Sequence, residues 1–192
     1  MKQAASRELY AYWQDLRGRR PAPLRAEIEP GAIRHVLGEA FIVALDRNTG
    51  YPFRLAGTRV CALFGRELKG ESFVSLWDEA SRKTIFDLLN ILAKETIGTV
   101  AGVTTQNTDG EPLELELLML PLLAPRPMLA RTIGVLTPVK IPQWIGLRRV
   151  GALTLGSRRH VGALVQNRLL PHLLTPWSNR RGLVVYEGGR SS

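Results

Sequence analysis

The first apolar pattern in the chain has helical spacing. Leu9, Trp13 and Leu16 recur at intervals of four and three residues, which puts them on one side of a helix. Ser6 is a common N-terminal capping residue, and Gly18 favours the end of a helix. The pattern therefore predicts an amphipathic helix between Ser6 and Gly18, with an apolar stripe that needs a surface to pack on.

Short elements are predicted next. A helix is predicted over Pro30–Leu37, because proline is tolerated in the first turn of a helix and a glycine follows the last residue. The apolar runs Phe41–Leu45 and Pro52–Ala56 flank the turn-forming sequence Asn48-Thr49-Gly50 and predict a hairpin. A short helix is predicted over Thr58–Phe64, with threonine as its cap.

The clearest helix is predicted over Asp78–Thr96. Its large aliphatic residues fall at the offsets of one buried face, namely Ile85, Leu88, Leu89 and Leu92. Gly98 follows and ends the helical pattern.

The apolar period changes to two after residue 98. The segments Val100–Thr105 and Leu113–Leu117 are joined by Asp109-Gly110 and predict a second hairpin. Glutamates such as Glu116 alternate with the leucines, so one face of this hairpin is expected to be exposed. Arg131–Val139 predicts the last strand. Strands separated by helices in this order predict an α+β fold, with an antiparallel sheet and its helices on one face.

Basic residues are concentrated after Val139. The 192-residue chain has a net charge of +9; nine basic residues and one acid, Glu187, follow position 139, so that part carries +8 and the first 139 residues carry +1. This distribution favours an acidic or polyanionic partner. The opening residues lack the apolar run of a secretory signal, and no apolar run approaches the roughly 18 residues of a membrane span. We therefore expect a cytoplasmic protein without a transmembrane segment.

Catalytic and metal-binding motifs are not recognisable in the sequence. Cys61 is the single cysteine, which excludes a disulfide framework and a thiolate metal cluster within this chain. The spacing of His35, His160 and His172 fits no zinc motif. No nucleophile-elbow motif or glycine-rich phosphate loop is present. We expect neither an enzyme nor a metal site.

A longer block carries a family resemblance. The sequence FRLAGTRVCALFGRELKG, residues 53–70, and a Trp-Leu-Arg pattern near the start resemble a family of stand-alone PAS-domain proteins typical of alphaproteobacteria. The residues that carry the resemblance are Trp13, Leu16, Arg17, Ala56, Gly57, Thr58, Cys61, Phe64, Gly65, Arg66, Glu67 and Leu68. The resemblance covers roughly residues 8–139.

The resemblance implies a topology that periodicity leaves open. A PAS fold has a five-stranded antiparallel sheet in the spatial order 2-1-5-4-3, with helices on one face. The chain would then comprise an N-terminal helical segment (1–25), a PAS core (26–139) and a basic, partly ordered extension with proline and glycine (140–192). Helices that precede PAS cores commonly pair or cover the outer sheet face. We therefore expect a homodimer through Leu9, Trp13 and Leu16.

The resemblance also implies a ligand pocket between the sheet and the helices. The candidate lining residues are Leu55, Phe64, Phe73, Trp77, Ile85 and Leu89. Arg66 and Arg82 are candidates to hold an acidic group of a small ligand, because guanidinium binds carboxylate through two hydrogen bonds. The alternative is that the aromatic side chains fill the core and the arginines pair with Glu67 or Glu71 on the surface.

The usual PAS cofactors are not expected. Haem-binding PAS domains use a histidine on the long helix, and the predicted helix over residues 78–96 contains none. Cys61 lacks the sequence context of the cysteine in flavin-binding PAS domains. A small buried residue is the better interpretation of this cysteine than a reactive thiol.

PAS domains serve regulation in several ways, so the family alone does not fix the activity. We expect a non-enzymatic regulatory protein that contacts an unidentified regulatory partner, with or without a small ligand as modulator. The alternative is a PAS dimer whose basic extension binds nucleic acid or an anionic membrane. The candidate polyanion-binding residues are Arg148, Arg149, Arg158, Arg159, Arg180 and Arg181.

Overall fold

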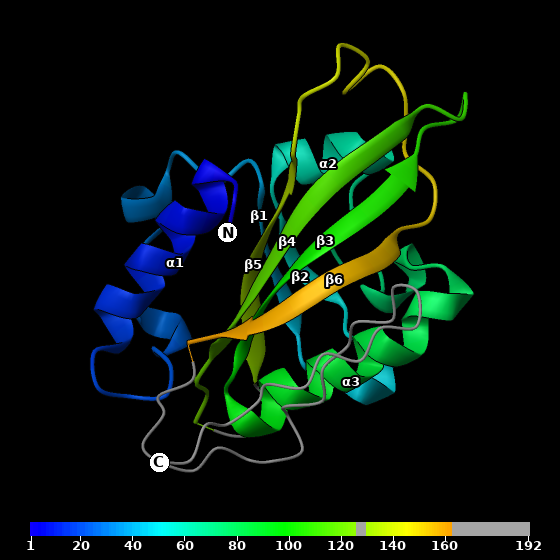
Figure 1. Cartoon of the computed structure of the whole chain (residues 1–192). Coiled ribbons are helices and arrows are strands. Elements are labelled where there is room, and N and C mark those ends of the chain that lie inside the picture. The colour runs from blue at the N-terminus through cyan, green and yellow to red at the C-terminus, as the bar shows by residue number, and fades with distance from the viewer. Residues whose placement is uncertain (126–129, 163–192) are drawn as a thin grey trace, which may run out of the picture.

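The computed structural model describes residues 1–125 and 130–162, which form an α+β fold around one antiparallel sheet (Figure 1). The strands lie in the order β2-β1-β5-β4-β3-β6. Their bounds are β1 Ala40–Ala44, β2 Phe53–Ala56, β3 Gly98–Gln106, β4 Pro112–Leu122, β5 Arg131–Pro138 and β6 Thr154–Val161. The order expected for the first five strands is confirmed, and β6 is an additional strand beside β3.

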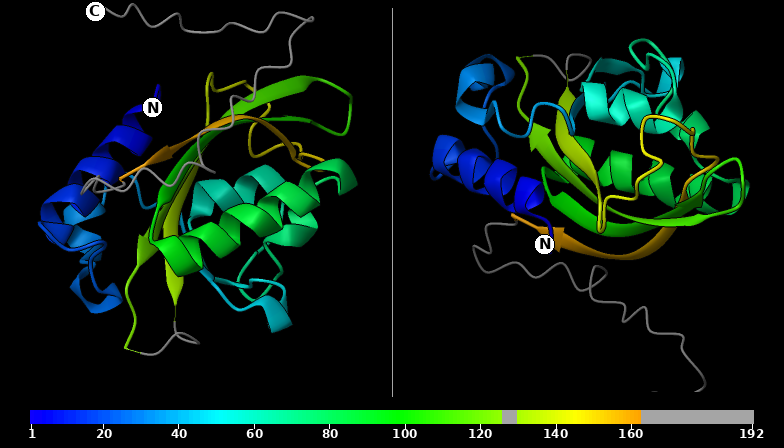
Figure 2. Two further views of the ribbon diagram at one scale, coloured as in Figure 1. Left: turned by 60° about the horizontal axis from the view of Figure 1, so that its bottom comes forward. Right: turned by 90° about the horizontal axis from the view of Figure 1, so that it is seen from above.

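The helices lie on both faces of the sheet (Figure 2). The α-helices are α1 (Ala4–Arg17), α2 (Thr58–Phe64) and α3 (Glu79–Glu95), and the 3-10 helices are η1 (Arg25–Glu27), η2 (Pro30–Ile33), η3 (Arg47–Thr49) and η4 (Val74–Leu76). Helices α2 and α3 cover the inner face, and α1 covers part of the outer face. Two apolar clusters result, one on each side of the sheet.

The apolar stripe of α1 packs against the chain's own sheet. Leu9 and Trp13 are fully buried, and the Trp13 Nε1–H donates to the carbonyl oxygen of Pro121 in β4 at 2.8 Å. Arg17 lies over the Trp13 ring, 5.1 Å from its centroid. The expectation that a second chain is needed to bury this stripe is therefore wrong, because strands β4 and β5 already cover it. Leu16 is only partly buried. The homodimer itself stays a prediction.

The start of α1 also differs from the prediction. The helix begins at Ala4, and Gln3 occupies the N-cap position. Ser6 lies inside the helix and is buried, so it is not the capping residue. The reason is a contact distant in sequence, since Glu116 of β4 accepts hydrogen bonds from the backbone N–H groups of Lys2 (2.6 Å) and Gln3 (3.1 Å).

Glu116 is buried, although the alternation of β4 predicted an exposed face. Burial by itself would raise the pKa of this carboxyl group. The N–H groups of Lys2 and Gln3 and the positive charge of the N-terminus oppose burial, and the net effect is a lowered pKa. The carboxylate thus fixes the start of α1 on the outer face of the sheet.

Replacing Glu116 by alanine is expected to lower the free energy of unfolding by about 1–3 kcal/mol at neutral pH, because two backbone donors lose a charged acceptor. The folded-state pKa is depressed, so this stabilisation is complete above the ordinary pKa of glutamate and is lost as the pH falls through the folded-state pKa. Urea unfolding across pH 3–7 measures both effects. Equal pH dependence of the wild type and the variant would contradict this assignment.

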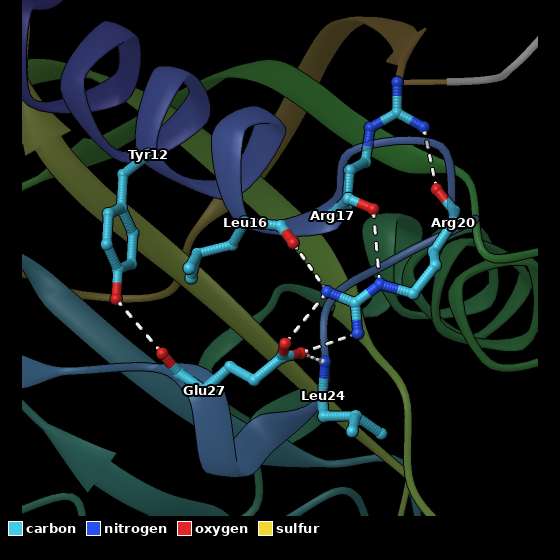
Figure 3. Close-up of polar contacts among 6 residues, drawn as sticks. All are labelled: Tyr12, Leu16, Arg17, Arg20, Leu24 and Glu27. Carbon is cyan, nitrogen blue, oxygen red and sulfur yellow. Dashed lines mark hydrogen bonds and ion pairs between the residues drawn. The ribbon is translucent and has the colours of Figure 1, made fainter.

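Hydrogen bonds around Arg20 and Glu27 hold the end of α1 (Figure 3). Arg20 binds both carboxylate oxygens of Glu27, at 2.8 and 2.9 Å, and also donates to the carbonyl oxygen of Leu16 at 2.6 Å. The Leu24 N–H donates to Glu27 at 2.6 Å, and the Tyr12 hydroxyl donates to the Glu27 carbonyl oxygen. Residues 18–29 are thereby folded back along α1.

The motif that carried the family resemblance is structural in this chain. A Cβ atom on Gly57 would lie 2.1 Å from the Leu37 carbonyl oxygen, so only glycine permits the close approach of these two backbone segments. The N–H groups of Arg59 and Val60 then donate to the carbonyl oxygen of Gly38. Gly65 ends α2 with φ +64°, a left-handed conformation typical of helix C-termini.

Residues beyond β5 complete the inner cluster. Val150 and Leu153 are buried in it, and their N–H groups donate to the carbonyl oxygens of Leu63 and Leu76, each at 2.8 Å. Asp78 caps α3 and also accepts a hydrogen bond from the Thr154 hydroxyl at the start of β6. The segment from 140 to 161 is thus integrated with the helices and the sheet.

No helix in the described part of the chain has both the length and the apolar character needed to cross a membrane.

Candidate functional site

The space between the sheet and the inner helices is filled by aromatic side chains. Phe73 lies at the centre, with ring centroids 5.7 Å from Phe41, 5.6 Å from Phe53 and 5.8 Å from Trp77. Of the predicted pocket residues, the structure brings together five in this cluster, namely Phe64, Phe73, Trp77, Ile85 and Leu89, and each is at most 3% exposed. These five residues lie between the sheet and the helices, as expected, and they are buried in one cluster. Their role in binding a ligand stays a prediction.

Leu55 is the exception among the apolar pocket candidates. It lies opposite Ile42 and is 41% exposed, so its assignment to the interior is wrong. The cause is a register shift between Ile42 and Val43, because Ile42 pairs with Leu55 whereas Val43 pairs with Phe53. The irregularity at Arg54 turns Phe53 inward and leaves Leu55 on the other side.

The two arginines proposed as anchors do not point into the interior. Arg66 is exposed and forms a two-pronged ion pair with Glu71, with N–O distances of 2.9–3.0 Å. Arg82 is exposed and donates from Nε to the carbonyl oxygen of Trp77 at 3.0 Å. The expectation that they anchor an acidic ligand inside the core is wrong, and the alternative of a surface pair with Glu71 applies to Arg66.

Trp77 carries an unpaired polar atom within the inner apolar cluster. The side chain is fully buried, and its indole Nε1–H has no hydrogen-bond partner among the described residues. An unpaired buried donor is unfavourable, so this atom marks the place where a small acceptor would be stabilised.

Cys61 fits its interpretation as a packed residue. It is 7% exposed, and its thiol lies 3.9 Å from the carbonyl oxygen of Ala56 and 3.7 Å from Glu67. Burial is the main cause of a raised pKa of the thiol, which disfavours the nucleophilic thiolate. Within residues 1–125 and 130–162, no group of three His, Cys, Asp or Glu side chains is arranged to hold a metal ion.

The outer face of the sheet carries an open groove of about 710 Å³. Strands β3 and β4 form its floor, and the residues around it come from the N-terminus, β6 and Val139, which follows β5. Gly102 in β3 and Gly156 and Ser157 in β6 have small or absent side chains that leave the groove open, and Lys2 and Arg159 supply positive charge. The sequence did not predict this groove, because Gly102 and Gly156 lie on different strands and no sequence motif links them.

The predicted polyanion-binding arginines that the structure describes come from two separate segments. Arg148 pairs with Asp109 on the β3–β4 turn, and Arg149 is exposed beside Gly65. Arg158 and Arg159 are exposed on β6. The remaining pair, Arg180 and Arg181, lies outside the described residues.

Comparison with known proteins gives one family match. A family model described as a PAS domain matches residues 1–137. No curated protein matches the chain. The matched range includes α1 and ends before β6, so the sixth strand is an addition to the part that the family model describes.

Proposed function

The chain belongs to the PAS domain family, and on this premise we propose that it is a regulatory protein that acts by contact between its surface and a partner protein. Membership in this family is consistent with signalling and sensing, but PAS domains share a fold without sharing one activity. The proposal is therefore based on the site geometry. The proposal includes no catalytic step. We still expect the protein to be cytoplasmic and to come from an alphaproteobacterium.

The filled interior is the observation that carries the proposal. Phe73 and Trp77 occupy the region in which a sensor would hold its ligand, and both are buried by neighbouring side chains. Arg66, one of the two candidates for recognition of an acid, is paired with Glu71 on the surface. Features that remain open to a partner lie outside, along the outer groove and β6.

Modulation by a small molecule is supported by one atom. The unpaired Nε1–H of Trp77 would donate to a ligand carbonyl or carboxylate if Phe73 and its neighbours moved apart. We include this modulation in the proposal as a secondary element.

A second candidate function is binding of a polyanion. The exposed arginines 158 and 159 favour contact with nucleic acid or an anionic membrane. Binding that falls steeply with added salt and is lost when both residues are replaced by glutamate in the full chain would support this candidate.

Crosslinking of the full-length protein in its native cells, followed by purification and mass spectrometry, tests the proposed function. We expect the same protein partner in independent preparations. Recovery of only the chain itself, or of nucleic acid in place of protein, would contradict contact with a partner protein as the mode of action.

A further inference from the structure

Strand β6 forms one edge of the sheet, and in the described part of the chain it pairs with β3 alone (Figure 1). The opposite edge is closed. At β2, the N–H of Phe53 donates to the Glu71 carbonyl oxygen at 2.9 Å, and the N–H of Gly70 donates to the Phe53 carbonyl oxygen at 2.8 Å. The two edges therefore differ, and β6 is the edge on which a further strand can pair.

The exposed part of this edge begins after the first residues of β6. The Leu155 N–H donates to the Ser81 hydroxyl of α3 at 2.9 Å, which satisfies the start of the strand. From Gly156 to His160 every residue is exposed. In an antiparallel edge strand, alternate backbone N–H and C=O groups face away from the neighbouring strand and are free to pair with an added one.

The side chains of this edge favour a partner segment of negative charge. Arg158, Arg159 and His160 follow one another, and successive residues of a strand point to opposite faces, so both faces of the edge carry basic groups. A second copy of β6 would place like charges across the new ladder, which is destabilising. Residues 163–192 contain four arginines and one glutamate, so their net charge has the same sign as that of the edge. An acidic segment from another protein fits best.

We propose that the edge of β6 binds an acidic, extended segment of a partner protein as an additional strand of the sheet. The proposal rests on the proposed function, because it names the surface and the chemistry of that protein contact. The added strand would pair with the outward backbone groups of residues 156–160, and its carboxylates would lie beside Arg159 and the neighbouring basic residues.

A labelled peptide of about ten residues with alternating glutamate and valine provides the probe, titrated against the full chain by fluorescence anisotropy. We expect saturable binding and slower hydrogen exchange of the amides of residues 156–160. A peptide of identical sequence with N-methyl groups on alternate residues keeps the charge but cannot form the ladder, and its binding should be weaker by at least about tenfold. Arg159→Glu should weaken binding by a similar factor, whereas Arg34→Glu, at an exposed site beyond η2, should leave it unchanged.

Four results would overturn the proposal. Equal binding of the two peptides would show that charge alone is recognised. Equal or tighter binding of a single-stranded DNA of the same charge would assign the edge to polyanions. Slow exchange of the outward-facing amides of residues 156–160 in the free chain would show that the edge is already covered. If Arg159→Glu still crosslinks to the same partner in cells, the β6 edge is not the binding site and the proposed function stands. If neither the wild-type protein nor Arg159→Glu captures a protein partner, the proposed function itself fails.

Discussion

Replacing Trp77 by alanine is expected to lower the free energy of unfolding by about 3–5 kcal/mol, since a fully buried indole is removed and a cavity remains. The loss includes the contacts with Phe73, whose ring centroid lies 5.8 Å away. Urea or thermal unfolding of the full chain measures this change.

Trp77→Phe is the matched control. It keeps most of the ring packing and removes the unpaired N–H, so a much smaller loss is expected than for alanine. A similar large loss in both variants would mean that Nε1 does have a partner, and would contradict the description of this atom as unpaired.

Replacing Trp13 by alanine is expected to have an effect of the same size, about 3–5 kcal/mol. Trp13 is fully buried between α1 and the outer sheet face, and its loss leaves the Pro121 carbonyl oxygen without its donor and Arg17 without its aromatic platform. Denaturant unfolding monitored by circular dichroism reports the change.

Trp13→Ala also tests whether α1 packs within one chain or forms a dimer interface. Because the stripe is buried within one chain, Trp13→Ala should reduce stability without converting a dimer to a monomer. Leu16→Ala, at a partly buried position, should cost less. A stable monomer formed from a wild-type dimer, detected by sedimentation, would show instead that α1 is the dimer interface.

Helices and turns were predictable where local signals agree. The predicted Thr58–Phe64 coincides with α2, but the prediction of Thr58 as its cap is wrong, because Gly57 occupies the N-cap position and no side chain caps the helix. The predicted Asp78–Thr96 differs from α3 only at its capping residues. In both, the apolar spacing and the terminal residues point to the same limits. Of the helix predicted over Pro30–Leu37, only Pro30–Ile33 is helical, and it is a 3-10 helix.

Contacts distant in sequence explain the errors. Nothing near Glu116 indicates that the backbone of Lys2 and Gln3 will cover it, so alternation alone predicts exposure. Leu55 follows the period of Phe53, but the register shift opposite Val43 places the two side chains on different faces.

β6 was missed for a related reason. Its sequence around Arg158 and Arg159 has no apolar alternation, because the strand is exposed over most of its length. Pairing with β3 holds it in place, and its residues provide little of the buried surface that produces a sequence pattern. A basic exposed edge strand therefore looks like a loop at the level of sequence.

The central claim is that protein side chains fill the PAS interior and that the molecule acts through its surface. Native mass spectrometry of the full chain, purified without heating from its own cells, tests this most directly. We expect the mass of the polypeptide alone, or a whole multiple of it. An additional small organic molecule that is retained by the wild type and lost from Trp77→Phe would contradict the claim and make the interior a ligand site.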